Sequence, residues 1–309
     1  MLQDATAGDP ISGVKWTRKT LRKLVRQLRR RGFQISPPTV KRLLRQQQFA
    51  LRVNRKRLTH EVQPLRELQM RYIARRRHAF EKAGFPVISI DCKKKELIGP
   101  FRNSGRIWRQ TPWAVYDTDF PSQATGKAIP YGIYDVQRNA AYVVVGTSRE
   151  TSEFAAAALR AWWWEVGRHH YAQANKLLVL ADGGGGNFCG GLRWKAGLQR
   201  LANEFNLTIT VTHYPPGASK WNPIEHRVFS QISENWAGEP LVSYETVLKF
   251  IRTTRTNTGL HCRARLDPTV YETKLKLSPA ELAGIHLGRR LVRPNWNYTI
   301  TPRAAARTK

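Results

Sequence analysis

The sequence predicts an α/β protein in which a mixed five-stranded sheet, with helices on both faces, follows a small all-α module. Three observations lead to this prediction. The first 60 residues show only helical periodicity and are far more basic than the rest of the chain. From residue 84 onward, short apolar segments rich in β-branched residues alternate with amphipathic segments. Two of the apolar segments lead directly into an aspartate.

The balance of charge is the strongest compositional feature. The chain has 309 residues, and its 52 Lys and Arg against 22 Asp and Glu give a net charge of +30. Such a charge repels itself on compaction unless a polyanion offsets it, and nucleic acid is the usual polyanion. A ribosomal-type protein or an unrelated basic enzyme is the alternative. A hydrophobic content of 41% indicates a globular chain.

Cysteine usage and hydropathy exclude several classes of protein. Cys92, Cys189 and Cys262 form no C-x-x-C pair, so neither a disulfide framework nor a zinc finger is indicated. The N-terminal residues lack the apolar region of a signal peptide, and no run of about 18 apolar residues is present to span a bilayer. We therefore expect a soluble protein of the cytoplasm with no membrane partner.

Residues 1–60 are expected to form a separate basic module. They carry 16 Lys and Arg against two Asp, so nearly half of the net charge lies in a fifth of the chain. Apolar residues at helical spacing predict a first helix that Thr17 caps and Gly32 ends. After a short turn, Ser36 caps a second helix. Two helices joined in this way form the helix-turn-helix arrangement, whose second helix enters the major groove of DNA.

The second helix of this module is predicted to bury Val40, Leu43 and Leu44. Its other side carries three cations that we expect to contact DNA, Lys41, Arg42 and Arg45. Phosphate contacts alone would account for these side chains without any reading of base sequence. The alternative is a solvated basic face on an ordinary helical hairpin.

The remaining elements predict a definite order. A linker helix over 65–81 places Leu65, Leu68, Tyr72 and Ile73 on one face. Strands are predicted over 85–90, 131–136, 141–145, 177–181 and 207–211, and helices over 152–167 with Ser152 as cap, over 192–205 and from 222 onward. The resulting order βββαβαβα, with a hairpin turn at 138–139 and an insertion at 93–128, is that of the ribonuclease-H fold.

Three acidic residues fall where this fold brings strand ends together. Asp91 ends the first predicted strand, Asp182 ends the fourth, and Glu225 lies one turn into the helix after the fifth. The residues at helical spacing after Glu225 are apolar, so its side chain is expected to face the sheet. Placing several carboxylates close together away from water costs folding free energy unless a cation balances their charge. Mg²⁺ favours carboxylate oxygens, and two such ions about 4 Å apart suit in-line displacement at phosphorus.

Each of these residues also has a structural interpretation. Asp91 can simply end a strand, Asp182 can form a turn before the glycine run 183–186, and Glu225 can complete a capping box with Asn222. The glycine run lacks the G-K-[ST] of a phosphate loop and is interpreted as a mobile loop beside the metal site. His213 and His226 lack cysteine partners for zinc and are interpreted as structural or phosphate-contacting.

Five motifs in order resemble one family. They are IDCKKKE at 90–96, GKAIPYG at 126–132, LADGG at 180–184, SKWNPIEH at 219–226 and WNY at 296–298. Together they resemble the bacterial insertion-sequence transposases of the Rhodopirellula-type DDE family over essentially the whole chain. The resemblance implies that Asp91, Asp182 and Glu225 are a DDE triad holding two Mg²⁺ or Mn²⁺ ions. It also implies nicking at the ends of a mobile element, followed by attack of the freed 3′-hydroxyl on target DNA.

The same motifs supply further residues expected to contact DNA, namely Lys93, Lys94, Lys95, Lys220, Trp221, Asn222 and His226. The expected partner is double-stranded DNA, both element ends and target, with an oligomer of this chain as the active form in the nucleoid of a bacterial cytoplasm. The expected domains are the DNA-binding module 1–60, a linker helix within 61–84, a catalytic domain 85–258 with the insertion 93–128, and a C-terminal extension 259–309.

Two departures from the family pattern bear on function. Cys92 stands where the family usually has Thr, a change expected to leave metal binding intact. Family members also carry a longer N-terminal arm with a further helix-turn-helix, so this chain is expected to be a shortened copy or to have a misassigned start. That leaves two alternatives to an active transposase: a DNA-binding relic that no longer transposes, and a ribonuclease-H-like nuclease without strand transfer.

Overall fold

A computed structural model describes residues 6–8, 15–17, 19–51, 66–218, 221–273 and 275–303. The chain divides into two compact units, 1–60 and 61–309. In the described ranges, no helix is long and apolar enough to cross a membrane.

The first unit contains the two helices that the sequence predicts. Helix α1 spans Leu21–Arg30 and helix α2 spans Pro37–Gln46, with the Ser36 side chain accepting from the backbone N–H of Thr39 as a cap. The cap of α1 is Thr20, not Thr17 as expected, because Thr17 belongs to a strand. Gly32 lies just beyond α1 with a φ of 88°, a conformation that suits glycine at a helix end.

Two features of this unit correct the prediction. Strands β1 (Thr6–Gly8) and β2 (Lys15–Thr17) pair antiparallel, so the unit is not all-α. Leu43 is 43% exposed instead of buried. Val40 and Leu44 lie four residues apart on the face that packs against α1, and Leu43 is rotated away from that face.

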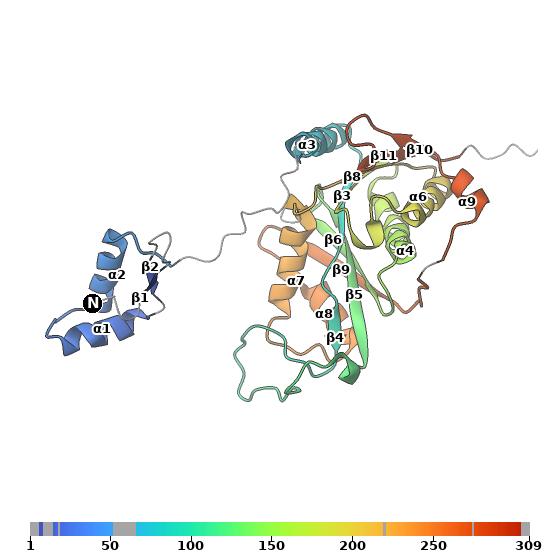
Figure 1. Cartoon of the computed structure of the whole chain (residues 1–309). Helices are drawn as coiled ribbons and strands as arrows, with labels where there is room; N and C mark the ends of the chain where they lie inside the picture. The colour runs from blue at the N-terminus through green and yellow to red at the C-terminus, as the bar shows by residue number, and fades with distance from the viewer. Residues whose placement is uncertain are drawn as a thin grey trace, which may run out of the picture. The chain divides into compact units, whose positions relative to one another are not determined.

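The second unit is built on a large mixed sheet (Figure 1). In the described residues its order is β10-β11-β8-β7-β3-β5-β6-β9, with β4 added beside β5. The strands are β3 (Val87–Cys92), β4 (Glu96–Ile98), β5 (Gly126–Asp135), β6 (Ala140–Gly146), β7 (Lys176–Ala181), β8 (Thr208–His213), β9 (His261–Asp267), β10 (Leu287–Arg289) and β11 (Asn297–Ile300).

The five predicted strands are confirmed as β3, β5, β6, β7 and β8. Strands β3, β7 and β8 run parallel to one another, and β5 is antiparallel to both β3 and β6. Asn139, in the predicted hairpin turn between β5 and β6, has a φ of 49°. The sheet is wider than the predicted five strands, because β4 comes from the insertion and β9, β10 and β11 come from residues 259–309.

Helices cover both faces of the sheet, as predicted. Their bounds in the described residues are α3 (Arg66–Lys82), α4 (Ser152–Trp162), α5 (Arg168–His170), α6 (Leu192–Phe205), α7 (Ser230–Asn235), α8 (Tyr244–Thr253) and α9 (Pro279–Ala283), with π-helical turns η3 (Trp163–Gly167) and η6 (Glu225–Phe229) and 3-10 turns η2 (Pro121–Gln123) and η4 (Gly185–Asn187). The cap of α4 is Thr151 instead of Ser152, since the Thr151 side chain accepts from the N–H of Phe154.

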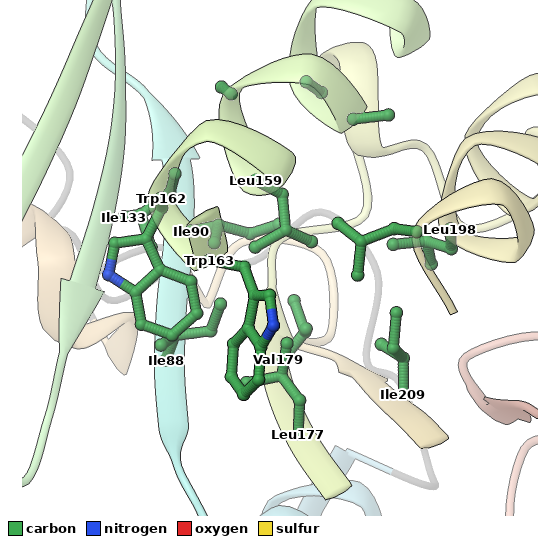
Figure 2. Packing of buried hydrophobic residues seen from close by; sticks show 14 of the residues in the cluster. Ile88, Ile90, Ile133, Leu159, Trp162, Trp163, Leu177, Val179, Leu198 and Ile209 are labelled. Atoms are coloured by element: carbon green, nitrogen blue, oxygen red, sulfur yellow. The ribbon is translucent and has the colours of Figure 1, made fainter. Parts of the chain in front are cut away.

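Each face of the sheet has its own apolar core. On one face, α4 and α6 bury Trp162, Trp194 and Leu198 against β3, β7 and β8. Figure 2 shows part of this cluster, with the indoles of Trp162 and Trp163 near isoleucines and leucines of the central strands. On the other face, residues of α3, α7 and α8 pack against β3, β5, β6 and β7. The central strands are therefore anchored from both sides, and their carboxyl ends hold fixed positions.

The linker helix α3 docks on the sheet through a polar side chain that the sequence did not indicate. Gln69 is fully buried, and its amide donates to the carbonyl of His213 at 2.8 Å and to Oδ1 of Asn297 at 3.0 Å. Leu68, expected on the buried face, is 47% exposed. Tyr72 and Ile73 are buried as predicted. At the N-terminal end of α3, the buried face of the helix is therefore shifted by one residue from the predicted face, with Gln69 buried in place of Leu68.

Candidate active site

Asp91 and Asp182 lie at the carboxyl ends of neighbouring parallel strands. The register of β3 and β7 pairs Ile90 with Ala181, so the two aspartates follow at equivalent positions on adjacent strands. Asp91 is 8% exposed and Asp182 is half-buried. Strand pairing, which acts over a long separation in sequence, therefore brings these two carboxyl groups to one edge of the sheet.

The Asp91 carboxylate has a donor on each oxygen. Oδ1 accepts from the backbone N–H of Cys92 at 2.7 Å, and Oδ2 accepts from Nδ2 of Asn222 at 3.2 Å. Burial, the charges of Asp182 and Glu225 and a side-chain hydrogen bond with Glu225 together raise the pKa of Asp91 to about 8, although the hydrogen bond from the Cys92 N–H lowers it. Asp91 is therefore held in close electrostatic contact with both other predicted ligands.

The Asp182 carboxylate is bound by its own downstream loop. Oδ1 accepts from Nδ2 of Asn187 at 3.0 Å and from the backbone N–H of Gly184 at 3.4 Å. Burial raises the pKa of Asp182, the Asn187 and Gly184 hydrogen bonds lower it, and the charges of Glu150 and Glu225 raise it again. In the described part of the chain, no hydrogen bond to Oδ2 of Asp182 is seen. That oxygen is the one left for another ligand.

Glu225 begins the π-helical turn η6. It is half-buried, and its charge raises the pKa values of both Asp91 and Asp182. The capping box that would have explained Glu225 structurally is not formed, because the Asn222 side chain bonds to Asp91 and to Ser89 instead. Single π-helical turns inside helices are often found at functional sites.

Asn222 lies inside the protein, where the sequence interpretation placed a DNA contact. It is fully buried, and its Oδ1 accepts from the hydroxyl of Ser89 on β3. The Ser89 hydroxyl in turn accepts from the backbone N–H of Ile224 at 3.3 Å. Both polar groups of the Asn222 side chain are thus used between β3 and the start of η6, and neither faces DNA.

Glu150 is a fourth acidic residue beside the two aspartates, and the sequence reasoning missed it. Its Oε1 accepts from the backbone N–H of Gly186 at 3.2 Å, and its Oε2 lies 3.4 Å from Nζ of Lys95. It precedes the Thr151 cap of α4 in a segment with no apolar periodicity, so the sequence offered no signal for it. Glu150 joins the loop that follows β3 to the loop that follows β7.

The three lysines after Asp91 have different surroundings. Lys93 is 8% exposed, with Nζ 2.8 Å from Glu96 and 4.4 Å from the centre of the Trp236 ring. Lys94 is exposed, and Lys95 is exposed and paired with Glu150. Of the three, Lys94 therefore faces solvent without an acidic partner in the described residues, whereas Lys93 is held inside the fold.

The other predicted DNA contacts lie at the surface or outside the described residues. Lys41, Arg42 and Arg45 are exposed on α2. Trp221 is 53% exposed and His226 is exposed, one on either side of the buried Asn222. Lys220 lies outside the described residues. A groove of about 480 Å³ passes Glu225 and is also lined by Lys93, Lys94, Asn103 and Ser104. The insertion thus supplies one wall of a groove at the acidic site.

His213 ends β8 as a buried structural residue. Its Nδ1 lies 2.6 Å from the carbonyl oxygen of Asp182, and its Nε2 lies 3.1 Å from the hydroxyl of Tyr298. The Tyr298 hydroxyl also accepts from Nε1 of Trp194 at 3.0 Å. The WNY motif at 296–298 therefore braces the strand end that carries Asp182.

The ligand atoms of the site suit a hard divalent cation. Its acidic groups offer only carboxylate oxygens, and each group's negative charge acts on its neighbours. In the ranges that the structure describes, no group of three or more His, Cys, Asp or Glu side chains is arranged so that it could hold a metal ion. Asp91 interacts electrostatically with each of the other two carboxylates, and the charge of Glu225 also acts on Asp182.

The chain is strongly basic, and its mixed sheet brings acidic side chains together at one edge. These features define an α/β protein with a carboxylate site. The chain is a member of the family described as "Rhodopirellula transposase DDE domain", which matches residues 1–302. Among curated proteins, none matches the chain.

Comparison with solved structures gives partial matches. A "pre-cleavage Mos1 transpososome" is 15% identical with a TM-score of 0.46, over 75% of this chain and 65% of that chain. A "Mos1 mariner paired end complex with Mn" is 17% identical with a TM-score of 0.42, over the same shares. A "Mos1 Strand Transfer Complex" is 16% identical with a TM-score of 0.44, over 75% of this chain and 64% of that chain. The chain thus spans slightly less than two thirds of each of these proteins.

Proposed function

We propose that this protein is a DDE transposase that nicks DNA at the ends of an insertion sequence and joins the freed 3′-ends to target DNA. The observation that carries the proposal is that Asp91 and Asp182 follow at equivalent positions on adjacent parallel strands and interact electrostatically with Glu225, in a member of a transposase family. The order of β6, β5, β3, β7 and β8, with only β5 antiparallel among the five, supports a ribonuclease-H-like catalytic domain over 85–258.

The three carboxylates are proposed to hold two Mg²⁺ or Mn²⁺ ions, with Asp91 shared between them. Mg²⁺ in such sites is usually bound by one or two carboxylates together with waters and substrate phosphate. The two pairs, Asp91 with Asp182 and Asp91 with Glu225, suit that requirement without a cluster of three ligands. When bound, such ions would activate the attacking oxygen and stabilise the leaving one.

Double-stranded DNA is the proposed partner. The basic module 1–60 is proposed to bind it as a helix-turn-helix, through Lys41, Arg42 and Arg45 on α2. Nearer the acidic site, Lys94, Trp221 and His226 are exposed and suited to phosphate or base contacts. We further propose that the active form is an oligomer of this chain, acting in the nucleoid of a bacterial cytoplasm.

The test separates catalysis from binding. Asp91→Asn, Asp182→Asn and Glu225→Gln keep side-chain size and remove the charge that holds a hard cation. Each is expected to abolish nicking of labelled element-end DNA in Mg²⁺ or Mn²⁺, a loss of at least about 100-fold as for other groups that stabilise the transition state. DNA affinity in gel-shift assays should stay equal or rise slightly, because a negative charge near phosphate is lost.

The matched control is Glu153→Gln, a glutamate paired with Arg193 at the start of α4. It should nick at close to the wild-type rate. Near-normal nicking by Glu225→Gln would remove Glu225 from the metal site. A wild-type chain that binds element ends but never nicks them would favour the DNA-binding relic over the transposase.

A further inference from the structure

We propose that Asn222 and Asn187 are paired positioning residues, each aiming the carboxylate of one aspartate of the site with a neutral amide donor. The inference rests on the proposed function, since it assigns a role toward the cation that Asp91 and Asp182 would hold. It gives Asn222 a role inside the protein in place of the DNA contact expected from its motif.

Asn222 has one orientation that satisfies its surroundings. A carboxylate oxygen can only accept, so the side-chain group 3.2 Å from Oδ2 of Asp91 must be the amide nitrogen. The amide oxygen then faces the Ser89 hydroxyl, which donates to it. Asn222 and Ser89 are both fully buried, so water does not compete for these bonds. The contact therefore fixes the plane of the Asp91 carboxylate relative to η6 and Glu225.

Asn187 makes the equivalent contact on the neighbouring strand. It is 1% exposed, and its Nδ2 donates to Oδ1 of Asp182 at 3.0 Å and to the carbonyl of Asp182 at 3.4 Å. The chain must turn back sharply after Asp182 to bring the Asn187 amide within hydrogen-bonding distance of the Asp182 carboxylate. Gly185 has a φ of 62°, and a Cβ on Gly186 would lie 2.7 Å from the Thr151 carbonyl oxygen. The glycine run therefore serves to return Asn187 to Asp182.

An amide is well suited to this task for an electrostatic reason. A lysine or arginine at either position would orient the carboxylate but also neutralise it, and would compete with a cation for it. An amide hydrogen bond fixes the orientation while the carboxylate keeps its full negative charge. The Asn187 contact also uses Oδ1 of Asp182 and leaves Oδ2 for another ligand. Loss of such hydrogen-bonding partners of metal ligands typically weakens metal binding about 10–100-fold.

The test uses the full chain and Mn²⁺ as the probe. Free Mn²⁺ is measured by electron paramagnetic resonance to obtain the dissociation constant for the wild type, Asn222→Ala and Asn187→Ala. Each variant should bind Mn²⁺ about 10–100-fold more weakly and show a smaller rise in Tm on Mn²⁺ addition. Saturating Mn²⁺ should restore nicking toward the wild-type rate, because the ligands themselves remain. DNA affinity without Mn²⁺ should not change.

The matched control is Asn235→Ala. Asn235 donates from its amide to the carbonyl of Phe250 at 2.7 Å, away from the acidic residues. This variant should have a lower Tm but the same Mn²⁺ dissociation constant as the wild type. If Asn222→Ala does not fold, Asn222→Ser, which keeps a small donor, should fold and bind Mn²⁺ with an intermediate constant.

The outcomes separate the two proposals. Asn222→Ala and Asn187→Ala could bind Mn²⁺ with the wild-type affinity and show only a lowered Tm, as expected for Asn235→Ala. That result would overturn the positioning role but not the proposal that the protein is a transposase. Unchanged Mn²⁺ binding in Asp91→Asn would instead overturn the metal site itself, and the positioning role with it.

Discussion

Nδ1 of His213 lies 2.6 Å from the carbonyl oxygen of Asp182, at the end of the strand next to the one that carries Asp182. A carbonyl only accepts, so Nδ1 carries the proton and Nε2 accepts from the Tyr298 hydroxyl. Donation therefore runs in one direction, from Trp194 through Tyr298 and His213 to Asp182. A second proton on His213 would make Nε2 a donor, and the Tyr298 hydroxyl would lose the acceptor of its own proton.

This relationship predicts a dependence of stability on pH. Burial lowers the pKa of His213 from 6.5 to about 4, and the hydrogen bond to the Asp182 carbonyl offsets part of that decrease. Because the folded pKa lies below the unfolded value, the contribution to stability is fully present above pH 6.5 and is lost as pH falls toward 4. The Tm of the wild type should fall over this range more steeply than that of His213→Asn. His226→Asn, at an exposed site, should keep the wild-type slope; equal slopes in all three proteins would contradict the prediction.

The basic module should carry a large part of the affinity for duplex DNA. Replacing Lys41, Arg42 and Arg45 together with Ala should weaken binding and make the plot of log K against log salt shallower by up to about 2.7, since each phosphate contact contributes about 0.9. Binding isotherms at several salt concentrations measure this slope. Arg160→Ala, at an exposed arginine already paired with Glu204, is the control. An unchanged slope in the triple variant would mean that these side chains are only solvated.

Lys93 and Lys94 are adjacent but should respond differently to Ala. Lys93→Ala removes an ion pair with Glu96 and a contact with the Trp236 ring, and should cost roughly 2 kcal/mol of folding stability. Lys94→Ala should leave Tm nearly unchanged but weaken DNA binding and reduce the salt slope by about 0.9. Thermal melts and DNA titrations on both variants check this. The prediction fails if Lys94→Ala melts earlier than Lys93→Ala.

The glycines of the run 183–186 should also differ. A Cβ at Gly186 would lie 2.7 Å from the Thr151 carbonyl oxygen, whereas a Cβ at Gly183 meets nothing within 4 Å. Gly186→Ala should therefore lower Tm and, by displacing Asn187, weaken Mn²⁺ binding. Gly183→Ala should be close to neutral in both measurements. Equal effects of the two changes would indicate a loose loop without a defined path.

The sequence was informative where residue type changes sharply at the end of an element. Asp91 and Asp182 could be found because each follows a mainly apolar segment predicted as a strand, and Glu225 because apolar residues follow it at helical spacing. The order of the five central strands followed from the same alternation. These features depend on local periodicity, which sequence records directly.

Other features depend on contacts between distant segments. Asn222 and Gln69 are polar residues whose burial is compensated by partners far away in sequence, Asp91 and Asn297 among them. Nothing in their own neighbourhood distinguishes them from surface residues. Strand β9 did leave a signal that was missed, since Cys262 and Ala264 are buried and Arg263 is exposed, the alternation of a half-buried edge strand.

The position of β11 has a consequence for synthesis of the chain. Asp91, Asp182 and Glu225 are all made before Asn297, yet β11 pairs with β8, and Tyr298 completes the contacts of His213. A chain held on a ribosome stalled just before Asn297 would have all three carboxylates, an unpaired edge on β8 and no Tyr298 to complete the contacts of His213. The nascent chain therefore contains all three acidic residues before β11 and Tyr298 are available to support the strand end at Asp182, so the proposed catalytic site becomes ordered only after this later segment has been made.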